Sequence, residues 1–98
     1  MKIIFISQPF KGKSISETDE IRAAAKEKLY QKFGENILFV SAFDLQRKED
    51  DIRALGECIK RLANADLLYM CKGWEESRGC SIERRVAILY EIPIEYER

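Results

Sequence analysis

The feature that most constrains the fold is an alternation of short, uninterrupted apolar runs with segments of helical periodicity. The runs lie at residues 2–7, 37–40 and 67–70, and a shorter one at 92–94 contains a proline. Such runs are typical of strands buried on both faces. Between them, apolar residues recur with the spacing of one helix face. These stripes are Ile21, Ala25, Leu29 and Phe33; Ile52, Leu55, Ile59 and Leu62; and Ile82, Val86, Leu89 and Tyr90.

The order strand–helix–strand–helix–strand–helix–strand predicts an α/β fold. We expect a parallel sheet of about four strands with helices on both faces, in one domain spanning residues 1–98. Pro93 predicts that the last strand lies at an edge. Ligands of such folds bind at the carboxyl ends of the strands. The loops 7–15, 41–47 and 71–79 are therefore expected to meet there.

Composition excludes several kinds of function. Seventeen Lys and Arg balance seventeen Asp and Glu, so we expect no nucleic-acid partner. No apolar run approaches the length of a membrane span or of a signal-peptide core, so we expect no membrane partner and a cytoplasmic location. Histidine is absent and the three cysteines form no Cys-x-x-Cys pair. We therefore expect neither a metal nor a cofactor, and acid–base chemistry must depend on other side chains.

The stretch Ser-Gln-Pro-Phe-Lys-Gly-Lys-Ser, residues 7–14, matches only the end of a nucleotide-triphosphate loop. Ser7 replaces the first glycine, Pro9 removes a backbone N–H, and the helix is expected to begin later, with Ser16 as its cap. Asp66 precedes its strand, so it is not placed to hold magnesium. The sequence therefore does not favour a phosphate loop here.

The stretch from Ser77 to Arg85 offers the main candidate chemistry. If the third helix begins near Gly79 or Cys80, Glu83 lies in its first turn, where the helix dipole favours an ionised carboxylate. Such a carboxylate can attack the anomeric carbon of a sugar. Ser77 and the N–H groups after Gly79 can bind an oxyanion. The alternative is that Glu83 only complements the helix dipole.

Residues 4–12 and 62–94, with the spacing Ser-x-Gly-x-x-x-Glu, resemble the nucleoside 2-deoxyribosyltransferase superfamily. It includes 2′-deoxynucleoside 5′-monophosphate N-glycosidases and short bacterial and phage proteins of unknown function. The resemblance implies a flavodoxin-like (Rossmann-like) three-layer fold and a homo-oligomer. It also implies a nucleoside or nucleotide as small-molecule partner. Within this pattern Glu83 is the catalytic nucleophile, Ser77 contacts phosphate, and Gly79 and Asp66 match the family's glycine and strand-leading aspartate.

The chain departs from the family pattern at the expected acid. The transferases carry an aspartate in the loop after the third strand and another about eight residues before the equivalent of Asp66. Counting back in this chain leads to Cys58, with Glu57 beside it. The group that would protonate the leaving base is thus absent or displaced. Glu57, Glu75 or Glu76 can take this role if a closed site raises the carboxyl pKa.

The remaining candidates lie in the first and third loops. Ser7, Gln8, Pro9 and Phe10 are expected to enclose the base and sugar. Trp74 can stack on a base or serve as a lid packed on its own protein. A helix N-terminus would lower the thiol pKa of Cys80. Two functions stay open: an enzyme acting at an N-glycosidic bond, and a module of the same fold that binds a nucleotide without cleaving it.

Overall fold

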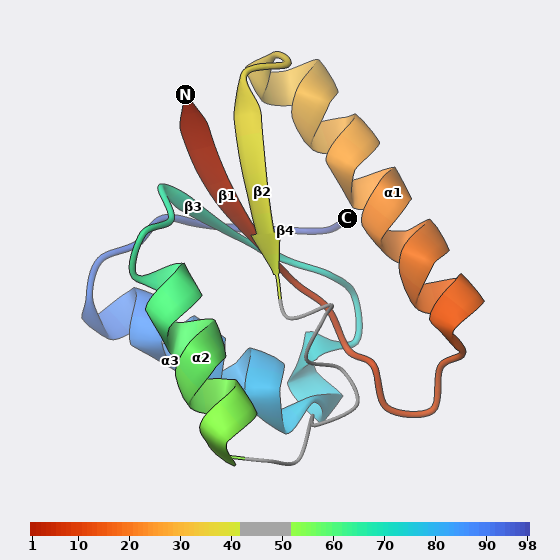
Figure 1. Ribbon diagram of the computed structural model, residues 1–98, viewed down its shortest axis with the longest axis vertical. Coiled ribbons are helices and arrows are strands. Elements are labelled where there is room, and N and C mark those ends of the chain that lie inside the picture. Colours follow the sequence, from red (N-terminus) through yellow and green to blue (C-terminus); the bar gives the residue numbers. More distant parts are fainter. Residues whose placement is uncertain (42–51) are drawn as a thin grey trace.

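The fold is a small flavodoxin-like α/β sandwich, as the sequence predicts. The computed structural model describes residues 1–41 and 52–98. Four parallel strands form one sheet in the order β2-β1-β3-β4. The elements are β1 (Lys2–Ser7), α1 (Ile15–Phe33), β2 (Ile37–Ser41), α2 (Ile52–Leu62), β3 (Leu67–Met70), the 3₁₀ turn η2 (Trp74–Glu76), α3 (Arg78–Leu89) and β4 (Ile94–Tyr96). Figure 1 shows α1 on one face of the sheet, with α2 and α3 on the other.

Alternation along the central strand β1 divides the core into two layers. Ile4 and Ile6 pack with Leu29 on the α1 side. Phe5 packs with Cys58 and other side chains of α2 and α3 on the opposite side. All five side chains are buried. Because side chains alternate along a strand, Ser7 shares the Phe5 face and points toward α3.

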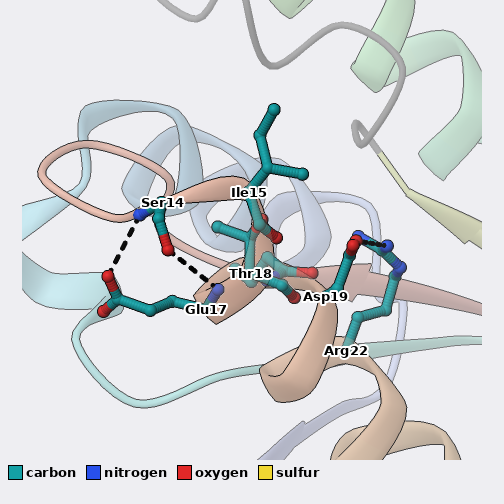
Figure 2. Close-up of polar contacts among 7 residues, drawn as sticks. Ser14, Ile15, Glu17, Thr18, Asp19 and Arg22 are labelled. Atoms are coloured by element: carbon teal, nitrogen blue, oxygen red, sulfur yellow. Dashed lines mark hydrogen bonds and ion pairs between the residues drawn. The ribbon is translucent and has the colours of Figure 1, made fainter.

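The first helix begins earlier than expected. Ser14, not Ser16, is its N-cap, and its hydroxyl accepts a 3.1 Å hydrogen bond from the Glu17 backbone N–H. The Glu17 carboxylate accepts from the Ser14 backbone N–H in return, at 3.2 Å, which completes a capping box (Figure 2). The helix therefore follows Gly12, Lys13 and Ser14 directly, and its start is no argument against a phosphate loop. The serine in place of the first glycine remains one.

One other boundary and one helix face differ from the prediction. The last strand is Ile94–Tyr96 instead of 92–94, although it lies at an edge as Pro93 predicts. In α2 the buried residues are Ala54, Cys58 and Leu62, while Ile52 is 81% exposed. The buried stripe of α2 thus consists of Ala54, Cys58 and Leu62 and includes only one residue, Leu62, of the stripe predicted from the sequence.

The three loops that are expected to meet at the carboxyl ends of the strands lie only partly within the described residues. Of the loop predicted at 41–47, residues 42–47 lie outside the described residues. The loops after β1 and β3 lie at the same end of the sheet (Figure 1). They are joined by a hydrogen bond from the Cys71 backbone N–H to the Ser7 carbonyl, at 2.9 Å. In residues 1–41 and 52–98, no helix is both long and apolar enough to cross a membrane.

Candidate functional site

A buried hydrogen bond between Ser7 and Glu83 lies at the centre of the candidate site. The Ser7 hydroxyl donates to Oε1 of Glu83 at 2.6 Å, across 76 residues of sequence. Ser7 is 1% exposed and Glu83 is 4% exposed. The short distance is typical of a hydroxyl bonded to a charged carboxylate. The structure therefore brings together two residues that the sequence assigned to the site separately.

Helical spacing explains why Glu83 faces the sheet. Cys80, Glu83 and Ala87 are the buried residues of α3. Spacings of three and four residues place these side chains on one face of the helix. Cys80 and Ala87 belong to the apolar core beneath α2 and α3. Glu83 is thus an acidic residue on a helix face whose other buried side chains belong to the apolar core.

The pKa of Glu83 is opposite in direction to the sequence expectation. Because α3 begins at Arg78, Glu83 is its sixth residue and lies beyond the first turn, where the dipole effect is largest. Burial raises the pKa of Glu83 from 4.5 to about 7, against hydrogen bonds from Ser7 and Cys58 that lower it. Glu83 is therefore close to half-ionised at neutral pH.

Cys58 occupies the position where the resemblance implies an aspartate. Its side chain hydrogen-bonds Glu83, and the group there is a thiol. Glu57 lies at the surface, with its carboxylate 3.9 Å from both Lys60 and Arg61. Glu75 and Glu76 are exposed on η2. The nearest substitute for the missing acid is thus Cys58 itself.

Ser77 serves as the N-cap of α3. Its hydroxyl accepts a hydrogen bond from the Cys80 backbone N–H at 3.3 Å. Gly79 lies in the first turn of the helix rather than at its start. The expectation that the helix N-terminus lowers the thiol pKa of Cys80 is wrong. Burial raises that pKa, although hydrogen bonds with Ser7 and Ser77 oppose the rise.

The first loop is held firmly against its neighbours. Pro9 is buried, and its Cγ lies 3.5 Å from where a Cβ on Gly73 would be. Nε2 of Gln8 donates to the Thr18 carbonyl at 3.0 Å. Oε1 of Gln8 is buried and, in the part of the chain that the structure describes, has no hydrogen-bond partner. Phe10 is half-buried at the rim of this loop.

Trp74 packs on its own protein. The centre of its ring lies 5.8 Å from the centre of the Tyr96 ring and 4.8 Å from Cζ of Arg84. Nε of Arg84 also donates to the Tyr96 hydroxyl at 2.8 Å. The sequence reading missed Tyr96, which comes to Trp74 through the pairing of β4 with β3. This packing is what the lid interpretation of Trp74 expects.

Two cavities lie beside α1 in the part of the chain that the structure describes. One cavity of about 650 Å³ lies between α1 and β4, and another of about 530 Å³ lies between α1 and β2. Neither is lined by Ser7 or Glu83. We locate the candidate site by the chemistry of Glu83. Carboxyl side chains are rarely buried, and a buried one with a shifted pKa at the carboxyl end of a parallel sheet is typical of a functional site. Within the described ranges, no group of three or more Cys, Asp or Glu side chains is arranged to hold a metal ion.

Comparison with known proteins gives a family but no activity. Residues 2–96 match the model of a domain of unknown function, DUF4406. The chain belongs to the DUF4406 family. No curated protein and no solved structure matches it. The matched residues of this DUF4406 chain include Ser7, Cys58 and Glu83.

Proposed function

We propose that this DUF4406 protein cleaves or transfers at the N-glycosidic bond of a deoxynucleoside or a deoxynucleoside 5′-monophosphate. The observation that carries the proposal is the 2.6 Å hydrogen bond between Ser7 and Glu83 at the carboxyl end of β1. Ligands of parallel α/β sheets bind at this end. The resemblance of the Ser77–Glu83 spacing to the deoxyribosyltransferase pattern supports the same reaction.

In this reaction Glu83 is the nucleophile. Its ionised carboxylate attacks C1′, and the bond from C1′ to the base nitrogen breaks with its electron pair moving to the base. The base takes a proton from water, and the water or base N–H that attacks in the next step returns one to the solvent. Water or a second base then displaces the Glu83 carboxylate from C1′. The two steps return Glu83 to its starting state.

Ser7 and Cys58 set how much of Glu83 is ionised. Both hydrogen bonds lower the pKa of the carboxyl, while burial raises it to about 7. The hydrogen bond from Ser7 also fixes the orientation of the carboxylate. Because Glu83 is only 4% exposed, substrate reaches it only if the surrounding side chains move apart. Closure after binding would shield the reacting carbon from bulk water until the base has left.

Gln8 and Ser77 supply groups for recognition. The buried Oε1 of Gln8 is a hydrogen-bond acceptor without a described partner, so a donor on the substrate, such as a sugar hydroxyl or a base N–H, would satisfy it. Ser77 caps α3 and Gly79 lies in its first turn, where backbone N–H groups favour an anion such as a 5′-phosphate. In this proposal Pro9 and Phe10 complete the first wall, and Trp74 forms a lid.

Cys58 favours a second candidate function. A thiol replaces the carboxylic acid expected at this position, so the leaving base lacks its usual proton donor. A nucleotide-binding module of the same fold would need no such donor. The two candidates differ in turnover, while both require that a nucleoside or nucleotide binds.

A chromatographic assay for released base tests the proposal. Wild type, Glu83→Gln and the exposed control Glu20→Gln are incubated with the four deoxynucleosides and their 5′-monophosphates. We expect release by wild type and by Glu20→Gln, and loss of release in Glu83→Gln. Binding without release would support the module instead. Release by Glu83→Gln at the wild-type rate would exclude Glu83 as the nucleophile.

The resemblance also supports a homo-oligomer in which a neighbouring subunit completes the site. Multi-angle light scattering during gel filtration tests this part of the proposal. A monomer at the concentration used in the assay, together with base release, would show that one chain suffices.

A further inference from the structure

The guanidinium group of Arg84 is held in a fixed position near the carboxyl end of the sheet. Its Cζ lies 4.8 Å from the centre of the Trp74 ring and 6.0 Å from the centre of the Tyr96 ring. Its Nε donates to the Tyr96 hydroxyl at 2.8 Å. The guanidinium also carries N–H groups on Nη1 and Nη2. These make no hydrogen bond to the described residues, and Arg84 is only half-buried, so they are open to a ligand.

The charge of this guanidinium is not compensated by an ion pair. No carboxylate in residues 1–41 and 52–98 forms a salt bridge with Arg84. Its contacts are with two aromatic rings and a hydroxyl, which fix its orientation and leave its charge in place. A group positioned before the ligand arrives loses less entropy on binding. The planar arrangement of its N–H groups matches the oxygens of a phosphate.

The register of the sheet relates this group to the candidate nucleophile. Ser7 pairs with Met70 across β1 and β3, and Met70 pairs with Tyr96 across β3 and β4. Residues in register share a face of the sheet, so Ser7 and Tyr96 lie on the same face, two strands or about 10 Å apart. Ser7 is bonded to Glu83, and Tyr96 is bonded to Arg84. Adjacent residues of α3 therefore place a carboxyl at the end of β1 and a guanidinium at the end of β4.

We propose that Arg84 binds the 5′-phosphate of the substrate, so that the protein prefers deoxynucleoside 5′-monophosphates to deoxynucleosides. This inference rests on the proposed function, in which Glu83 attacks C1′. The sugar of a nucleotide separates C1′ from the phosphate, as the two strands separate Glu83 from Arg84. The Trp74 carbonyl accepts a hydrogen bond from the Ser77 N–H at 3.0 Å, so Arg84 also lies beside the start of α3. The N–H groups there favour the same anion.

Calorimetric titration with the four deoxynucleosides and their 5′-monophosphates tests the inference. The protein carries Glu83→Gln, so that no ligand is consumed during the titration. Arg84→Gln and Arg84→Lys are the test substitutions, each added to this protein. Arg85→Gln is the matched control, because it removes the same charge from the next residue of α3, which is exposed. The titrations without a further substitution are repeated in added sodium chloride.

We expect a monophosphate to bind more tightly than its nucleoside, and this difference should shrink as salt rises. Arg84→Gln should raise the dissociation constant of the monophosphate by about tenfold or more, and that of the nucleoside by no more than about twofold. Arg84→Lys keeps the charge without the planar group, so it should recover only part of the loss. Arg85→Gln should change neither dissociation constant by more than about twofold.

Three results would overturn the inference. The first is equal weakening of nucleoside and monophosphate in Arg84→Gln, which would show that Arg84 only holds Trp74 and Tyr96 in place. The second is equal affinity for the two ligands before Arg84 is replaced. The third is an equal loss of monophosphate binding in Arg84→Gln and Arg85→Gln. If the wild type nevertheless releases base, the proposed function stands and only the role of Arg84 fails. Absence of binding by all eight ligands would overturn both.

Discussion

Replacing Glu83 with glutamine should stabilise the protein, and the gain should grow with pH. The folded protein raises the pKa of Glu83 from 4.5 to about 7. Below pH 4.5 the carboxyl is protonated in both the folded and the unfolded chain. Between pH 4.5 and 7 the folded chain holds a proton that the unfolded chain has released, so the free energy of unfolding falls as pH rises. Above pH 7 this loss is complete.

The magnitude follows from the pKa difference. At about 1.4 kcal/mol per pKa unit, full ionisation of buried Glu83 lowers the free energy of unfolding by about 3 kcal/mol. About 2.5 kcal/mol of this loss falls between pH 5 and pH 8. A small domain has a total stability of only about 5–15 kcal/mol. The amide of Glu83→Gln cannot ionise and can still accept the Ser7 hydrogen bond, so the variant avoids this loss.

Urea unfolding at pH 5 and pH 8 measures the effect, with the fluorescence of Trp74, the single tryptophan, as the signal. The gain of Glu83→Gln over wild type should be about 2.5 kcal/mol larger at pH 8 than at pH 5. Glu20→Gln, which changes an exposed carboxylate, should show no such difference. An equal gain at both pH values would refute the reasoning that burial raises the pKa of Glu83.

Two further substitutions test neighbouring parts of the account. Ser7→Ala removes a hydrogen bond that favours the ionised carboxylate, so the pKa of Glu83 should rise further. The midpoint of the pH-dependent stability loss should then move to higher pH. An unchanged midpoint would show that the bond does not act on the ionised form. Ser14→Ala removes the N-cap of α1 and should lower the free energy of unfolding by about 1 kcal/mol at both pH 5 and pH 8, as measured by urea unfolding. A loss in Ser14→Ala that varies between pH 5 and pH 8 would contradict a role confined to capping.

The first three strands could be predicted because each is an uninterrupted apolar run. Lys2–Ser7 and Leu67–Met70 lie in the middle of the sheet, where both faces are covered, so their sequences show no alternation. Helix starts were harder to predict. Ser14 and Ser16 can both cap, and the deciding signal was the glutamate at Glu17, three residues after Ser14.

A small error in a helix start changed the chemistry of the site. Beginning α3 at Arg78 moves Glu83 out of the first turn, and burial then decides its pKa instead of the dipole. The contact between Cys58 and Glu83 depends on how α2 packs against α3, which no local pattern encodes.

The pH dependence of base release tests the central claim most directly. If Glu83 attacks as a carboxylate, kcat/KM, measured at deoxynucleotide concentrations well below KM, should rise with pH through a midpoint near 7, the pKa of the buried carboxyl in the free protein. Glu83→Gln should show no release at any pH. A rate that falls as pH rises through 7, or release that persists in Glu83→Gln, would contradict the assignment of Glu83 as the nucleophile.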